Sequence, residues 1–208
     1  MDPRWIIHRD ARLVVLDKPS GLLSVPGRGP DLQDCLARRV QGVFPTVLVV
    51  HRLDRDTSGL MLMALDAEAQ RRLGRQFEDR TVRKAYQCIV RGSPEVDAGS
   101  VDLPIGRDPA RPPRYRIDDA GGRPSQTRWR VLERLAGRTR LAVEPVTGRS
   151  HQIRLHLATI GHPIVGDPLY ADEPTAAAAP RLLLHATELA VAHPDDGLPI
   201  AWTSACPF

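Results

Sequence analysis

Short apolar runs bounded by glycine, proline or aspartate recur along the chain and predict β-strands. They cover residues 13–16, 47–53, 60–65, 85–90, 126–131, 141–143 and 182–191. Helical patterns are fewer, and they do not alternate regularly with the strands. This arrangement predicts an α+β protein with a mixed, mainly antiparallel sheet, not a doubly wound parallel fold.

Three segments have helical character. Asp66 resembles an N-cap, and apolar residues at i, i+4 and i+8 predict a helix that ends near residue 78. Ser150 is a candidate cap for a second helix, which Gly161 would end. A third helix is expected over residues 32–40. The helices are expected to flank the sheet.

Composition is that of an ordinary soluble globular protein with 208 residues, enough for one large domain or two small ones. Apolar runs stay well short of the roughly 20 residues of a membrane helix, and the N-terminus shows no signal-peptide pattern. Cys35, Cys88 and Cys206 are scattered and include no CxxC pair. A disulfide framework is therefore not expected, and a reducing cytoplasm fits.

The basic residues are almost all arginines, because Lys18 and Lys84 are the only lysines in a chain of formal net charge +4. Arginine suits phosphate and stacks on bases, but codon bias in a GC-rich genome explains the excess equally well. The segment 107–124, rich in proline and glycine, carries five arginines. It can be a flexible finger that touches RNA or a solvated hairpin, and the residues alone favour neither.

A cluster of charges, HRLDRDTSGL at residues 51–60, interrupts two apolar runs. Gly59 gives the turn conformational freedom, and Asp56 has the character of a turn residue. Asp54 follows the first run directly, at the edge of the expected core. A carboxylate there needs a cationic partner, so a structural ion pair with Arg52 or Arg55 is the simplest interpretation of Asp54 from these residues alone.

Two other segments combine cations with groups that suit RNA. Lys84 and Tyr86 point to one side of a strand, where a tyrosine can stack on a base and a lysine can contact phosphate. In GRSHQIRLH, residues 148–156, a glycine turn leads into a helix start, which favours anions. Arg154 lies there on a different face from the apolar residues and can bind a carboxylate through two hydrogen bonds.

Histidines raise the possibility of a metal site, but their spacing does not support one. His151 and His156 are five residues apart, whereas two ligands on one helix face are four apart. The chain also lacks the glycine-rich and serine motifs of nucleotide binding and serine hydrolysis. No metal and no cofactor are expected.

Together these segments resemble a known family. HRLDRDTSGL, KAY, EPVTGRSHQIRLHLATIGHPIVGDPLYAD and LLLHATELAVAHP resemble the successive signatures of the RluA family of pseudouridine synthases, and DKPSGLLSVPG at residues 17–27 resembles its opening segment. The likeness spans roughly residues 12–195. The tail 201–208 matches no pattern of the family. No extra N-terminal RNA-binding domain of the S4 type is recognised, so a single catalytic domain over 1–208 of the RluA type itself is expected.

The resemblance implies a curved sheet with a central catalytic cleft, and isomerisation of uridine to pseudouridine without a cofactor. It implies that Asp54 is catalytic, that Tyr86 stacks on the flipped uracil and that Arg154 holds Asp54 ionised. Arg52 would help to fill the gap left by the flipped base. The other residues expected to bind RNA are Lys84, Arg28, Arg149 and His151.

The resemblance further implies an RNA partner, with an anticodon-loop uridine in tRNA and a 23S rRNA hairpin uridine as substrates. No membrane and no obligate protein partner are implied. Two other functions are kept as alternatives: an RNA-binding protein of the same fold without catalysis, and a metal-dependent RNA hydrolase that uses the histidines.

Overall fold

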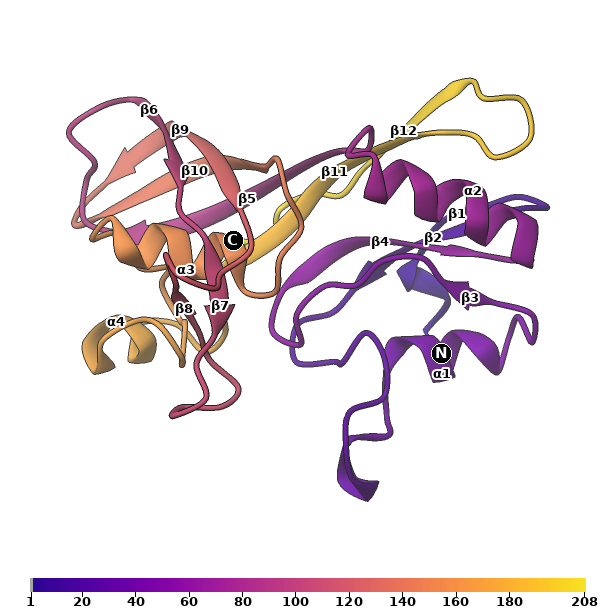
Figure 1. Cartoon of the computed structure of the whole chain (residues 1–208), viewed down its shortest axis with the longest axis horizontal. Coiled ribbons are helices and arrows are strands. Elements are labelled where there is room, and N and C mark those ends of the chain that lie inside the picture. Colours follow the sequence, from indigo (N-terminus) through magenta and orange to yellow (C-terminus); the bar gives the residue numbers. More distant parts are fainter. Residues whose placement is uncertain (1) are drawn as a thin grey trace. The chain divides into compact units, whose positions relative to one another are not determined.

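The computed structural model describes residues 2–208, and its contacts cluster in two compact units (Figure 1). Unit 1 comprises the chain up to Lys84 together with His185–Pro207, and unit 2 comprises Ala85–Leu184 with Phe208. The expectation of one catalytic domain over 1–208 stays a prediction.

The sheet of unit 1 is built mainly from antiparallel pairs. Its strands are β1 (Ile6–Arg9), β2 (Leu13–Lys18), β3 (Leu48–Val49), β4 (Ser58–Ala64), β11 (Leu184–Ala192) and β12 (Pro199–Thr203). β2 pairs with both β1 and β4, β3 pairs with β4, and β12 pairs with β11, all antiparallel. β4 and β11 form a parallel pair, in which Ser58 is opposite His185.

Gly59 allows this parallel pair to form. Its φ is 108°, a conformation that favours glycine, and a Cβ at this position would lie 2.3 Å from the carbonyl oxygen of Ala186. The start of β4, and with it the end of the HRLDRDTSGL segment, is therefore held directly against β11.

Helix α2 (Ala67–Glu78) confirms the first predicted helix. The side chain of Asp66 accepts hydrogen bonds from the backbone N–H groups of Glu68 and Ala69, both at 2.9 Å, as expected of an N-cap. Leu73 is fully buried and joins a core with residues of β2, β4, β11 and β12. Figure 1 shows α2 and α1 (Leu36–Gln41) on opposite sides of this sheet.

The third predicted helix, over 32–40, is wrong at its beginning. Two short 3-10 turns occur in unit 1, η1 (Pro3–Trp5) and η2 (Pro30–Leu32), and α1 starts only at Leu36. The reason is a bridge between Leu23 and Cys35, after which the backbone N–H of Leu36 donates to Leu23 at 2.8 Å. This pairing pulls the chain out of helical geometry just before α1.

In unit 2, neighbouring strands pair antiparallel in the order β5 (Arg83–Arg91), β10 (Arg138–Pro145), β9 (Gln126–Leu135) and β6 (Ala98–Asp102). Helix α3 (Gln152–Thr159) packs Ile153 and Leu157 into the core of this unit, where Leu141 and Val143 are fully buried. The short helix α4 (Glu173–Ala177) begins after Asp172, whose side chain caps it.

The start of α3 differs from the prediction. The N-cap is His151, in the left-handed conformation with φ 56° and ψ 14°, and not Ser150. Gln152 ties the turn before the helix to the helix start, because its Oε1 accepts the backbone N–H of Arg149 at 3.0 Å and the hydroxyl of Thr147 at 2.6 Å. Gly161, with φ 86°, follows the end of the helix as expected.

The first part of the segment 107–124 belongs to a short hairpin of β7 (Ile105–Arg107) and β8 (Tyr115–Ile117). Asp108 stabilises its tip: burial would raise the pKa of this carboxyl, but the hydrogen bond from Arg111 at 2.9 Å holds the pKa below its usual value. Four of the five arginines in the segment, Arg107, Arg111, Arg116 and Arg123, are exposed. The hairpin geometry is thus ordered, and its contact with RNA stays a prediction.

The predicted fold class is confirmed, since the chain is α+β with mixed but mainly antiparallel pairing and few helices. Among residues 2–208, no helix has the length and apolar character that spanning a membrane requires. The predicted cleft across the middle of the sheet stays a prediction.

Candidate active site

The loop that carries Asp54 lies between β3 and β4, and another segment of unit 1 fixes its backbone. Ser24 holds Leu53 from both sides: its hydroxyl donates to the Leu53 carbonyl at 2.6 Å and accepts the Leu53 N–H at 3.1 Å. The carbonyl of Arg55 accepts hydrogen bonds from Lys18 Nζ and from the N–H of Gly21, both at 2.9 Å. The residues on either side of Asp54 are therefore held in place.

Lys18 is a fully buried lysine whose contacts explain its position. Besides the Arg55 carbonyl, its ammonium donates to the carbonyls of Pro19 at 2.9 Å and Leu22 at 2.7 Å. Three carbonyl acceptors match the three donors of an ammonium group. Ser20 adds a further hydrogen bond, from its hydroxyl to the carbonyl of Asp56 at 2.7 Å. The DKPSGLLS segment thus acts as a support for the loop.

Asp56 has the structural role that its turn position indicates. Its carboxylate binds the guanidinium of Arg55, with Nε to Oδ1 at 3.0 Å. Arg55 was one of the two arginines considered as partners of Asp54, and the structure pairs it with Asp56. Asp54 itself is half-buried at the loop.

His51 and Lys84 lie close to this loop, around the ring of Phe77. His51 accepts the backbone N–H of Leu62 at its Nε2 at 2.9 Å and stacks on Phe77, with ring centroids 4.5 Å apart. Burial, with a smaller contribution from the nearby Lys84, lowers the pKa of His51 to about 3. Burial also lowers the pKa of Lys84, whose Nζ lies 6.0 Å from the Phe77 centroid. His51 is therefore neutral at physiological pH.

Tyr86 and Arg154 both belong to unit 2. Tyr86 lies on β5 opposite Val143 of β10, partly buried at the margin of the core. Arg154 lies on α3 and is 2% exposed, within the run Gln152–Leu157 whose residues are all buried.

The structure reveals an ion-pair partner of Arg154 that the sequence did not: Asp167, which is completely buried. Arg154 Nε donates to Asp167 Oδ2 at 2.8 Å, and Nη2 donates to Oδ1 at 2.7 Å. Asp167 Oδ1 also accepts the N–H groups of Leu169 at 2.9 Å and Tyr170 at 3.2 Å. The contact of Arg154 with Asp54 stays a prediction.

An aromatic cluster adjoins this ion pair. The Tyr170 ring lies 5.3 Å from the Arg154 guanidinium, and Tyr170 Oη lies 2.7 Å from Nδ1 of His151. The same hydroxyl accepts the backbone N–H of Tyr115 in β8 at 2.9 Å. The His151 ring is thereby bonded to Tyr170 and meets Tyr115 edge-on at 5.2 Å. A left-handed conformation costs a non-glycine residue on the order of 1 kcal/mol or more, and these contacts hold His151 in it.

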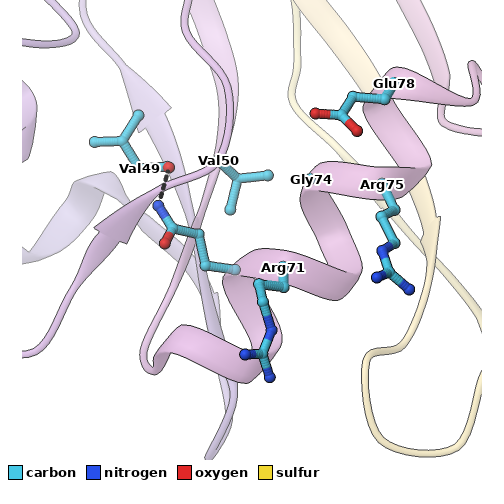
Figure 2. A pocket seen from close by; sticks show the side chains of 7 residues that line it. Val49, Val50, Arg71, Gly74, Arg75 and Glu78 are labelled. Atoms are coloured by element: carbon cyan, nitrogen blue, oxygen red, sulfur yellow. Dashed lines mark hydrogen bonds between the residues drawn. The ribbon is translucent and has the colours of Figure 1, made fainter.

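The remaining predicted RNA contacts are arginines at surface positions. Arg28 and Arg52 are exposed, and Arg149 is half-buried. A groove of about 370 Å³ in unit 1 lies elsewhere, between α2 and the chain at Val49 and Val50. Figure 2 shows Arg71 and Arg75 on its helical side. Gln70 Nε2 donates to the Val49 carbonyl at 2.9 Å. None of the predicted site residues lines this groove.

Histidine ring nitrogens in this protein are engaged by other groups. His156 binds the hydroxyl of Thr127 through Nδ1 at 2.9 Å and the carbonyl of Leu103 through Nε2 at 3.0 Å, and burial lowers its pKa. Over residues 2–208, no three or more histidine, cysteine or acidic side chains are grouped so that they could hold a metal ion.

Comparison with known proteins identifies the family. Residues 12–159 match the family of RNA pseudouridylate synthases. The chain is 43% identical to the dual-specificity RNA pseudouridine synthase RluA of Yersinia pestis over 204 residues, which cover 98% of this chain and 99% of that protein. It is 45% identical to the RluA protein of Haemophilus influenzae, over 98% and 93% of the two chains. This chain belongs to the RNA pseudouridylate synthase family.

Solved structures agree with this assignment. Human RNA pseudouridylate synthase domain containing 1 is similar with a TM-score of 0.83 and 29% identity, over 98% of this chain and 83% of that one. Human RNA pseudouridylate synthase domain containing 4 has a TM-score of 0.77 and 26% identity, over 98% and 89%. The predicted enzyme class, pseudouridine synthase, is confirmed, and RNA is the substrate of this family.

The individual site residues stay predictions. The structure brings Arg154 together with His151 in unit 2, and it places Asp54 in a loop of unit 1 with a fixed backbone. The role of Asp167 was missed. Its only signal in the sequence is an acidic residue that follows a glycine shortly after a helix containing an arginine, which is too common to be informative.

Proposed function

We propose that this pseudouridine synthase has two substrates, an anticodon-loop uridine in tRNA and a hairpin uridine in 23S rRNA, and that it acts in the cytoplasm. The observation that carries the proposal is the identity of 43% over 98% of the chain to a relative named for dual specificity. The likeness extends over nearly the whole of both proteins, and this extent supports the proposal.

The reaction is an isomerisation with no net change in atoms. The C1′–N1 bond of uridine breaks, the uracil turns and its C5 bonds to C1′. The proton on C5 is lost and N1 gains one, so the product has the formula of the substrate. A carboxylate is suited to this chemistry, because it can act as a nucleophile or stabilise the positive charge that develops at a glycosidic carbon.

Asp54 supplies this carboxylate in our proposal. Support comes from its position in the HRLDRDTSGL motif and from the hydrogen bonds that Ser24 and Lys18 make to the backbone on either side. A fixed backbone favours reaction, because catalysis depends on orientation within a fraction of an ångström. The ion pair of Asp56 with Arg55 supports a structural role for that carboxylate instead.

The other predicted residues bind and orient the RNA. Tyr86 stacks on the flipped uracil, and Arg154, itself held by Asp167, orients Asp54. Arg52 helps to fill the space that the base leaves in the RNA. Contacts with phosphates come from Lys84, Arg28, Arg149 and His151, with the exposed arginines of the 107–124 hairpin.

The test compares Asp54→Asn with Asp56→Asn as its matched control. We expect Asp54→Asn to release no tritium from RNA labelled at uridine C5, while RNA binding on filters stays within about twofold, because phosphate contacts and stacking supply the affinity. Asp56→Asn should keep substantial activity, since asparagine serves in the same turn.

The substrates are tested with separate transcripts of the tRNA anticodon arm and the rRNA hairpin, with circular dichroism as the check of folding. Turnover by a folded Asp54→Asn protein would disprove the role of Asp54. Binding without turnover by the wild type would favour the alternative of a non-catalytic RNA-binding protein. Modification of one transcript alone would reject dual specificity.

A further inference from the structure

Hydrogen-bonded polar side chains, most of them buried, connect the start of β4 with the end of β2 in unit 1 and form a polar chain. Ser58 Oγ lies 2.7 Å from Nδ1 of His185, Nε2 of His185 lies 3.0 Å from Oγ of Ser204, and Ser204 donates to Oδ2 of Asp17 at 2.8 Å. Ser58 is 3% exposed, His185 2% and Ser204 8%. The proposed mechanism gives none of these residues a task.

Two hydroxyl groups, one imidazole and one carboxylate form this series of hydrogen bonds. Ser204 donates its only proton to Asp17, so it accepts from Nε2 of His185. Nδ1 of His185 lies 2.7 Å from the hydroxyl oxygen of Ser58. The imidazole therefore links the two serines. Polar chains that are fully satisfied in this way hold the groups at their ends in one geometry.

The two ends of the chain lie at the Asp54 loop and its support. Ser58 is the first residue of β4, four positions after Asp54. Asp17 precedes Lys18, whose ammonium holds the carbonyl of Arg55. The end of β2 therefore fixes the loop directly through Lys18 and fixes the residue that follows the loop through Ser204 and His185.

Ser204 comes from the tail 201–208, which matched no pattern of the family in the sequence. It follows β12, and its backbone N–H donates to the carbonyl of Thr187 in β11 at 2.9 Å. The tail is thus anchored in the sheet, and the hydroxyl of Ser204 is the group that it contributes to the buried chain.

We propose that Ser204 and His185 are positioning residues for Asp54, so that the C-terminal tail is part of the catalytic framework. Neither residue touches RNA. Each acts through the hydrogen bond that it makes, and the effect at Asp54 is on orientation and hence on the rate of the bound substrate. The inference rests on the proposed function, since it assumes that Asp54 reacts.

The test measures kcat and KM by tritium release from a C5-labelled tRNA transcript. Ser204→Ala should lower kcat about tenfold with KM within about twofold, which is less than the roughly 100-fold cost of a 1 Å misplacement. Ser204→Thr keeps the hydroxyl and should recover at least about half of the lost activity. Thr203→Ala, an exposed neighbour on β12, is the control and should match the wild type.

A purely structural role would lower the melting temperature of Ser204→Ala and leave kcat per folded molecule unchanged, and that result would overturn the inference. Ser58→Ala interrupts the same chain at its other end and serves where Ser204→Ala does not fold: it should also lower kcat. The double variant should lose no more than the larger single loss, because both changes break one chain. The proposal is contradicted if the losses of kcat multiply in the double variant, or if folded Ser58→Ala has a normal kcat. A wild type that releases no tritium contradicts the proposed function instead.

Discussion

Replacing Asp167 by asparagine should destabilise the protein strongly, because Asp167 neutralises a buried guanidinium. Four hydrogen bonds converge on its carboxylate: two from Arg154, at 2.8 and 2.7 Å, and two from the N–H groups of Leu169 and Tyr170. Asparagine can place its one carbonyl oxygen at Oδ1 and keep three of them. Its amide N–H groups then face Nε of Arg154, where two donors meet.

The magnitude follows from the burial of both partners, 2% for Arg154 and 0% for Asp167. A lost hydrogen bond to a charged group costs about 1.5–3 kcal/mol. Removing one charge of a buried pair costs about 3–5 kcal/mol in total, because the other charge stays buried without compensation. We therefore expect the free energy of unfolding to fall by about 3–5 kcal/mol in Asp167→Asn.

The assay is urea unfolding followed by circular dichroism, with Asp97→Asn as the matched control. Asp97 also binds an arginine in unit 2, Arg134 at 2.6 Å, but the two side chains are 87% and 39% exposed. An exposed pair contributes about 0–1 kcal/mol, so this variant should unfold almost like the wild type. Equal losses in the two variants, or a loss below about 1 kcal/mol in Asp167→Asn, would refute the argument from burial.

Two further predictions concern His51 and the arginine hairpin. Burial lowers the pKa of His51 from 6.5 to about 3, so the unfolded chain binds a proton first and stability falls as pH drops from 6.5 toward 3. In urea unfolding between pH 7 and 5, the wild type should therefore lose up to about 2 kcal/mol more stability than His51→Gln, and an equal dependence of stability on pH in the two proteins would contradict this. Replacing Arg107, Arg116 and Arg123 together by glutamine should weaken RNA binding and leave kcat nearly unchanged. The slope of log affinity against log salt concentration should become shallower by up to about 0.9 per lost phosphate contact, whereas unchanged affinity would support the solvated hairpin instead.

Elements set by local sequence were predictable. Helix α2 has its cap, its apolar spacing and its end within residues 66–78, so the pattern located it well. Most of the long apolar strands were equally clear, but the strand predicted over 47–53 is wrong beyond β3 (Leu48–Val49), because the chain continues there as the Asp54 loop. The short or polar strands β1, β6, β7, β8 and β12 were not predicted, because partners distant in sequence stabilise them and their residues alone carry little pattern.

Long-range pairings were the features of the site that the sequence could not provide. Arg154 is 13 residues from Asp167, and Ser204 is 187 residues from Asp17. A buried cation needs an anion nearby, but the sequence does not indicate which aspartate supplies it. The same holds for His151, whose left-handed conformation depends on contacts with Tyr170 and Tyr115 and not on its own residue type.

The charge cluster at the edge of the core has a physical explanation in the way its loop is held. A loop that depended on its own charged side chains for shape would have to commit both aspartates to structural pairs. Here the DKPSGLLS segment binds the backbone of Leu53, Arg55 and Asp56, so the fold of the loop rests on main-chain hydrogen bonds. Asp56 adds an ion pair with Arg55. Because main-chain hydrogen bonds give the loop its shape, the carboxylate at position 54 can be selected for reaction, and the two aspartates should differ sharply when each is replaced by asparagine.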